Sequence, residues 1–146
     1  MELKRVVVTG LGALTPVGNT VAETWENLVN GVSGAGPITR FDVSNFKTKF
    51  ACEVKNFNPN EHLDRKEARK MDLYTQYAIV AAKQAIEDSA MDLETINKEK
   101  VGVICGVDLG GRRIIKKKMM SYAVNKDLGP KFSPFLIPKM IADIAS

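Results

Sequence analysis

The chain has 146 residues, of which 45% are apolar and 26% charged, and its formal net charge is +4. This composition is ordinary for a globular domain, and no apolar run approaches the length of a membrane span. Cys52, Cys105 and the single histidine, His62, lack metal-ligand spacing and are too few for a disulfide framework. Because no signal-peptide pattern precedes the first strand-like run, we expect a cytoplasmic protein without a membrane partner.

The first expected element is a buried strand over 4–8, where three valines follow two basic residues. Three glycines lie between this strand and the next helix, and such spacing suggests a dinucleotide site. The pattern fails because threonine stands where that fingerprint needs its third glycine, and Pro16 removes a backbone donor. We therefore interpret Gly10, Gly12 and Gly18 as residues that permit a tight turn.

A helix is expected over about 21–30. Thr20 and Glu23 have the spacing of a capping box, which predicts the start of the helix. Gly31 is typical of the residue that ends a helix. The apolar positions Trp25, Leu28 and Val29 are expected to form its buried stripe.

Residues 31–48 are rich in small and polar residues and predict a loop, and 50–54 suit a short edge strand. Asp64 and Glu67 form a second capping box, which predicts a long helix that ends near Ser89. Its alanine-rich face implies close approach to another helix or a sheet. The apolar positions that recur at helical spacing are Met71, Tyr74, Ala78, Ala82 and Ala85.

A second apolar strand is expected over 101–105, followed by a glycine-containing turn over 106–111 and a helix over 112–124. The alternation of strands and helices predicts an α/β fold. A last helix begins near Pro134, a residue suited to a first helical turn. Since this helix reaches Ser146 without a capping residue, we expect the chain to be the front part of a longer protein.

Four cations at the start of the long helix fall within about 140° of one another on a helical wheel. Cations near a helix N-terminus oppose the helix dipole, and this cost suggests an anionic partner. The alternative is a solvent-exposed face that Asp64 and Glu67 partly neutralise. The four residues are Arg65, Lys66, Arg69 and Lys70.

A second basic cluster lies within 112–118. Neither cluster carries interleaved aromatic residues or a base-reading motif, so we do not expect a nucleic-acid partner. His62 lies in a polar stretch and is interpreted as a solvated loop residue. Cys52 and Cys105 lie in apolar, strand-like contexts and are interpreted as buried, unactivated thiols.

Four segments in chain order carry a resemblance to a known family: 6–12, 16–19, 65–72 and 133–138. The chain resembles the N-terminal part of the bacterial β-ketoacyl-acyl-carrier-protein synthases, and most closely the type II condensing enzymes of fatty acid elongation. The resemblance runs through the whole chain without large gaps, and 65–72 is its most specific segment. It implies the N-terminal part of a thiolase-like α/β/α/β/α layered fold, a homodimer and no cofactor.

In that family a cysteine on a strand-to-helix turn accepts the acyl chain as a thioester. Two histidines then assist decarboxylation of malonyl-carrier protein, and the resulting carbanion attacks the thioester. All three residues follow Ser146 in the family's order, and Cys52, Cys105 and His62 match none of them. The resemblance therefore implies that residues 1–146 are an incomplete ketoacyl synthase domain without catalytic residues, inactive alone. The alternative is a non-catalytic carrier-binding or dimerisation module.

The resemblance also implies roles for several residues of this chain. Val107 and Asp108 stand where the family has small residues, and the basic residues of 112–118 replace a mixed or acidic helix, so acyl-chain preference is not readable. Carrier-protein docking is implied for Lys66, Arg69, Lys70 and Lys131. A place at the acyl pocket is implied for Leu109 and Phe135.

Overall fold

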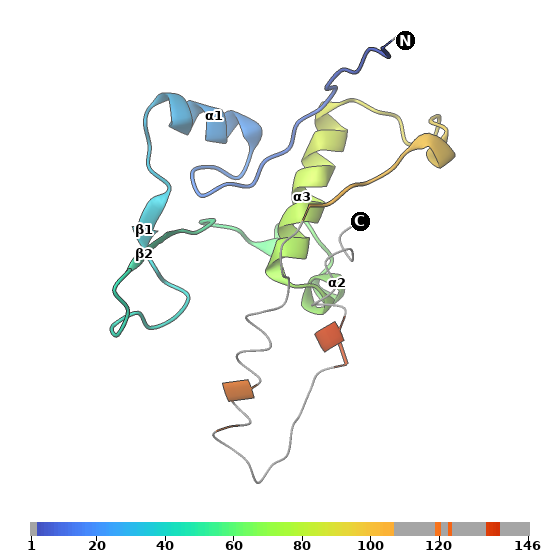
Figure 1. Cartoon of the computed structure of the whole chain (residues 1–146). Coiled ribbons are helices and arrows are strands. Elements are labelled where there is room, and N and C mark those ends of the chain that lie inside the picture. Colours follow the sequence, from blue (N-terminus) through green and yellow to red (C-terminus); the bar gives the residue numbers. More distant parts are fainter. Residues whose placement is uncertain (1–2, 107–118, 121–122, 124–133, 138–146) are drawn as a thin grey trace. The chain divides into compact units, whose positions relative to one another are not determined.

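The computed structural model describes residues 3–106, 119–120, 123 and 134–137 (Figure 1). These residues belong to two compact units. The first contains residues 3–58 and 80–96, and the second contains 59–79 together with the described residues after 96. The long helix α3 (Leu73–Asp88) contributes residues to both units. No helix in the described part of the chain has the length and apolar character needed to cross a bilayer.

The start of α1 (Val21–Val29) in the first unit confirms the predicted cap. The Thr20 hydroxyl accepts a hydrogen bond from the Glu23 amide at 3.2 Å. The Glu23 carboxylate reaches back to the Asn19 amide at 2.7 Å. Two amide donors that α1 cannot satisfy are thus paired by neighbouring side chains, which fixes where the helix begins.

The end of α1 also lies where the sequence predicts it. Gly31 has a φ of 68°, a left-handed conformation that glycine adopts without a Cβ penalty. Its amide donates to the Leu28 carbonyl at 3.1 Å, and the Val32 amide donates to the Asn27 carbonyl at 2.9 Å. This pair of bonds is the Schellman arrangement, which satisfies carbonyls at the end of a helix.

The predicted buried stripe of α1 is wrong for the described structure. Trp25, Leu28 and Val29 are 67%, 56% and 68% exposed. Helical periodicity places apolar residues on one face, but it does not supply the element that covers that face. Among the described residues no segment does so.

The chain before α1 runs along the C-terminal part of α3 (Figure 1). A Cβ at Gly10 would lie 2.1 Å from the Ala85 carbonyl oxygen, and one at Gly12 would lie 1.9 Å from that of Ala81. Only glycine permits backbone to approach backbone so closely. The alanine-rich helix is thus approached closely, but by a segment without regular secondary structure and not by the helix or sheet expected. Gly10 and Gly12 are explained by this packing and not by the predicted tight turn.

Side chains of α3 hold the same segment by hydrogen bonds. The Leu11 amide donates to the Asp88 carboxylate at 2.9 Å, and the Ala13 amide donates to the Gln84 side-chain oxygen at 3.0 Å. The Gln84 side-chain nitrogen in turn donates to the Asn19 carbonyl at 2.8 Å. Asp88 and Gln84 are four residues apart on one helix face, so they meet alternate amides of an extended segment.

The predicted strand over 4–8 is not present. Residues 3–14 have no regular secondary structure, and Val6, Val7 and Val8 are exposed. The same correction applies to 101–105, where Val103 and Ile104 are exposed. A strand needs a neighbouring strand to satisfy its backbone groups, and neither run has one among the described residues.

A two-stranded antiparallel sheet lies in the first unit. It consists of β1 (Ala35–Pro37) and β2 (Phe50–Cys52), with Ala35 opposite Cys52 and Pro37 opposite Phe50. The strand expected over 50–54 is thus confirmed in its first three residues. β1 falls inside the predicted loop, because alanine, glycine and proline give no strand signal.

The second unit contains η1 (Pro59–Glu61), α2 (Arg65–Lys70), the start of α3 and η2 (Lys98–Lys100). The single helix predicted from 65 to about 89 is therefore two helices. Met71 between them is extended, with φ −97° and ψ 151°. The Asp72 carboxylate accepts from the Leu73 amide at 2.8 Å, and its carbonyl accepts from the Gln76 amide at 3.1 Å. Aspartate competes for backbone groups in this way, which favours a new helix start.

Few apolar side chains are buried. Among the described residues, Ala68 in the second unit and Val80 in the first are 7% and 1% exposed. The polar Thr75 is fully buried in the second unit, and its hydroxyl has no hydrogen-bond partner there.

The turn over 106–111 and the helix over 112–124 lie largely outside the described residues, although Met119, Met120 and Ala123 are helical. Of the last helix, residues 136–137 are helical.

Candidate functional site

The cationic face of α2 is the candidate site, and side chains near both ends of the helix hold it in place. At its start the Asp64 carboxylate accepts from the amides of Lys66 and Glu67 at 2.8 and 3.2 Å. This confirms Asp64 as the predicted N-cap. At its end the Gln76 side-chain nitrogen donates to the Ala68 carbonyl at 2.8 Å. These bonds satisfy backbone groups near both ends of α2 and so stabilise a helix of only six residues.

The arrangement of charges on α2 follows from its one buried residue. Ala68 is 7% exposed, whereas every other residue of the helix is exposed. At about 100° per residue, Lys66 and Lys70 each lie about 160° from Ala68 and so form the centre of the outer face. Arg69 flanks them on one side and Glu67 on the other. We call Lys66, Arg69 and Lys70 the docking face, after the role that the sequence resemblance implies for them.

The three cations of the docking face differ in their contacts. The Lys70 ammonium lies 2.6 Å from the Glu67 carboxylate, and the two side chains are 45% and 50% exposed. Within the described part of the chain, neither Lys66 nor Arg69 has an ion pair. The docking face therefore presents two uncompensated cations beside one that is internally paired.

The break after α2 changes how its cations lie relative to the helix dipole. Arg69 and Lys70 occupy the last turn of α2, because the helix ends at residue 70. Cations are favourable at the C-terminal end of a helix. Only Arg65 and Lys66 oppose the dipole, so the local cost of the cluster is smaller than the sequence suggests.

The described structure does not test the other predicted site residues. Lys131 and Leu109 lie outside the described residues, as do Val107, Asp108 and 112–118. Phe135 lies in a turn and is 42% exposed. The roles assigned to Lys131, Leu109 and Phe135 therefore stay predictions.

Both cysteines are free thiols, Cys52 exposed and Cys105 half-buried. The prediction of buried thiols is wrong for Cys52, because β2 belongs to a two-stranded sheet that leaves this side chain uncovered. His62 is exposed beside η1, as expected of a loop residue. In the described ranges no group of three or more acidic, cysteine or histidine residues could hold a metal ion.

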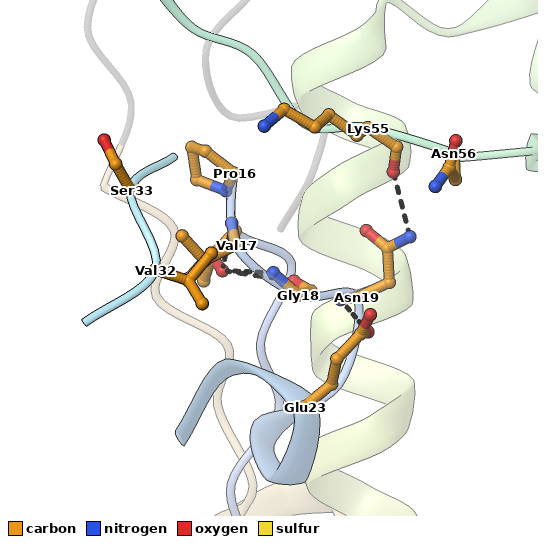
Figure 2. Close-up of a pocket in the computed structure, with 10 residues that line it drawn as sticks. Pro16, Val17, Gly18, Asn19, Glu23, Val32, Ser33, Lys55 and Asn56 are labelled. Atoms are coloured by element: carbon orange, nitrogen blue, oxygen red, sulfur yellow. Dashed lines mark hydrogen bonds between the residues drawn. The ribbon is translucent and has the colours of Figure 1, made fainter. Parts of the chain in front are cut away.

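A hollow of about 220 Å³ in the first unit includes Gly18 and tests the nucleotide interpretation (Figure 2). A pyrophosphate site needs free backbone amides at a helix start. Here the amides of Val17 and Gly18 donate to the Thr15 hydroxyl at 3.2 and 3.0 Å, and that of Asn19 donates to Glu23. Because the amides are already paired and a carboxylate lines the hollow, it is unsuited to a phosphate.

Comparison with known proteins agrees with the resemblance of the sequence. Residues 3–146 match the family described as beta-ketoacyl synthase, N-terminal domain. The chain belongs to this family. The 3-oxoacyl-acyl-carrier-protein synthase 2 of Synechocystis sp. (strain ATCC 27184 / PCC 6803 / Kazusa) is 45% identical over 147 residues, which cover 100% of this chain and 35% of that protein. The chain spans about a third of the length of the curated relatives it matches.

Solved structures show the fold. A beta-ketoacyl synthase from Burkholderia phymatum STM815 matches with a TM-score of 0.75 and 22% identity, over 98% of this chain and 35% of that one. The ketosynthase AntDE, solved with its type II PKS acyl-carrier protein AntF, matches with a TM-score of 0.70 and 22% identity, over 92% of this chain and 35% of that one. These likenesses confirm the predicted class, the N-terminal α/β part of a thiolase-like ketosynthase fold.

Proposed function

We propose that the chain is the N-terminal portion of a β-ketoacyl-acyl-carrier-protein synthase of fatty acid elongation. Such an enzyme condenses an acyl thioester with malonyl-carrier protein, and decarboxylation of the malonyl group supplies the carbanion. The proposal is supported by membership of the family over 3–146 and by the 45% identity to a synthase 2 along the whole chain. In this proposal the nucleophile and its two assisting histidines come from the part of the enzyme outside this chain.

The role proposed for this portion is capture of the acyl carrier protein by the docking face. The observation that carries the proposal is a pair of exposed cations, Lys66 and Arg69, that have no ion pair among the described residues and lie on a helix fixed at both ends. A carrier protein that is small and acidic would be attracted to such a surface, and the attraction would act mainly on the association rate. A solved ketosynthase of the same fold binds an acyl-carrier protein. Lys131 is proposed as a further docking residue.

Three finer features belong to the same proposal. Leu109 and Phe135 would line the acyl pocket, and the intact enzyme would be a homodimer. It would act in the cytoplasm. The pocket residues and the homodimer follow from the resemblance to the condensing enzymes. Each of the three features has its own test: acyl-chain preference of pocket variants, mass in solution, and cell fractionation.

A chimeric enzyme tests the proposed function. Residues 1–146 would replace the corresponding segment of the Synechocystis relative, which aligns with the whole chain. The chimera should condense an acyl thioester with malonyl-carrier protein, whereas residues 1–146 alone should show no turnover above a control without protein. A folded chimera that binds the carrier protein but does not condense would contradict the proposal and favour the non-catalytic module. Turnover by residues 1–146 alone would contradict the assignment of the catalytic residues to another part of the enzyme.

A further inference from the structure

Glu67 is the one acidic side chain within α2, and it lies beside the docking face. Its carboxylate contacts the Lys70 ammonium at 2.6 Å. Its backbone amide is the part of the residue that Asp64 caps, so the helix start does not use the Glu67 side chain. The carboxylate is therefore free to act on docking without a part in the cap.

We infer that Glu67 is an attenuator of carrier docking that withholds Lys70 from an acidic partner by pairing with it. This inference rests on the proposed function. An acidic partner can use Lys70 only when it displaces the Glu67 carboxylate or shares the ammonium with it. Lys66 and Arg69 are available without such a competition.

The geometry makes the competition reversible. Both side chains of the pair are about half exposed, so the pair is weak and water solvates both charges when it opens. Residues three apart on a helix are neighbours, which keeps the carboxylate within reach of the ammonium after each opening. Glu67 also places a negative charge at the margin of a surface that receives an acidic protein, and this charge repels the partner. Both effects weaken capture of the carrier, which suits a partner that must leave after each transfer.

The effect is confined to one member of the docking face. On a helical wheel, Lys66 and Lys70 lie on either side of the point directly opposite Ala68, and Glu67 is the neighbour of Lys70. The Lys66 ammonium has no ion pair within the described residues. The contribution of Lys70 to docking should therefore depend on Glu67, while that of Lys66 should not.

A double-mutant cycle tests the inference in the chimera described above. Association rates with acyl carrier protein would be measured at low salt for Glu67→Gln, Lys70→Met and the double variant. Glutamine keeps the shape and removes the charge. Glu67→Gln should raise the association rate about 1.4- to fivefold, a range set by the strength of exposed ion pairs. Lys70→Met should cost more in the Glu67→Gln background, where the ammonium is free to contact the partner, than in the unmodified background, where the loss is limited to repulsion by the unpaired Glu67 carboxylate.

Two further variants keep the test specific. Glu26→Gln removes the same charge from an exposed position on α1 and should leave the association rate within experimental error. Lys66→Met should cost the same with and without Glu67. If Glu67→Gln and Lys70→Met act independently, or if Glu67→Gln slows association, the inference is wrong. If no variant of the docking face changes carrier binding, it is the proposed function that fails.

Discussion

Reversing the charge of the docking face should weaken binding of the acyl carrier protein. The ion pairs of the structure set a lower limit for this loss. The perturbation is the triple variant Lys66→Glu, Arg69→Glu, Lys70→Glu. An exposed ion pair is worth about 0.2–1 kcal/mol, and reversal replaces attraction with repulsion, which about doubles the change. Lys66 and Arg69 together then account for about 1–4 kcal/mol, and Lys70→Glu adds to this because it leaves Glu67 unpaired beside a second carboxylate that repels the partner. The dissociation constant should rise at least about fivefold.

Stopped-flow association in the chimera is the suitable assay, because surface charge acts mainly on encounter. The loss should shrink as salt is added, since the screening length falls from about 10 Å at 0.1 M salt to about 3 Å at 1 M. A matched control reverses three exposed lysines of the first unit, Lys47, Lys49 and Lys55, and so changes the net charge by the same amount. Equal losses in the two triple variants would refute the reasoning, because they would assign the effect to net charge. Equal losses for carrier-bound and small uncharged thioesters would mean that α2 supports the fold rather than docking.

Three other predictions concern the chain itself. Gly12→Ala should lower the free energy of unfolding by about 1–3 kcal/mol in urea denaturation, since its Cβ would lie 1.9 Å from the Ala81 carbonyl oxygen. An equal effect of Gly36→Ala, whose Cβ would meet nothing within 4 Å, would contradict this. The Thr39 hydroxyl donates to the Glu53 carboxylate at 2.7 Å and lowers the pKa of Glu53 below its ordinary 4.5. This bond therefore stabilises the fold above pH 4.5, and the stabilisation is lost as the pH falls through the lowered pKa. Thr39→Val should flatten the dependence of melting temperature on pH in that window, and an unchanged profile would count against the bond. The isolated 146-residue chain should self-associate through the exposed stripe of α1, as measured by sedimentation, and a monomer at all concentrations would refute this.

Features that depend on a few neighbouring residues were predictable from the sequence. Thr20 and Asp64 cap the helices that follow them, and Gly31 ends α1, because a cap needs only a side chain and the nearby backbone amides or carbonyls. The position of the docking face was predictable for the same reason. Lys66 and Lys70 are one helical turn apart, so the formation of α2 alone places them together.

Features that depend on distant partners were not predictable. The runs at 4–8 and 101–105 have the composition of strands, but a strand forms only beside another strand. The break at Met71 was missed because apolar spacing continues through it, and the competing signal was the aspartate that follows. The three-residue spacing of Glu67 and Lys70 in the sequence permits an ion pair between them. The sequence does not show that the pair forms or how exposed its two side chains are.

The central claim is that α2 receives an acyl carrier protein, and an NMR titration tests it most directly. Unlabelled acyl carrier protein would be added to the isotope-labelled chimera at low salt, and backbone amide shifts would be followed residue by residue. We predict that the largest shifts fall within 64–72 and that they disappear in the triple charge-reversal variant. Shifts that fall elsewhere and leave 64–72 unchanged would contradict the claim.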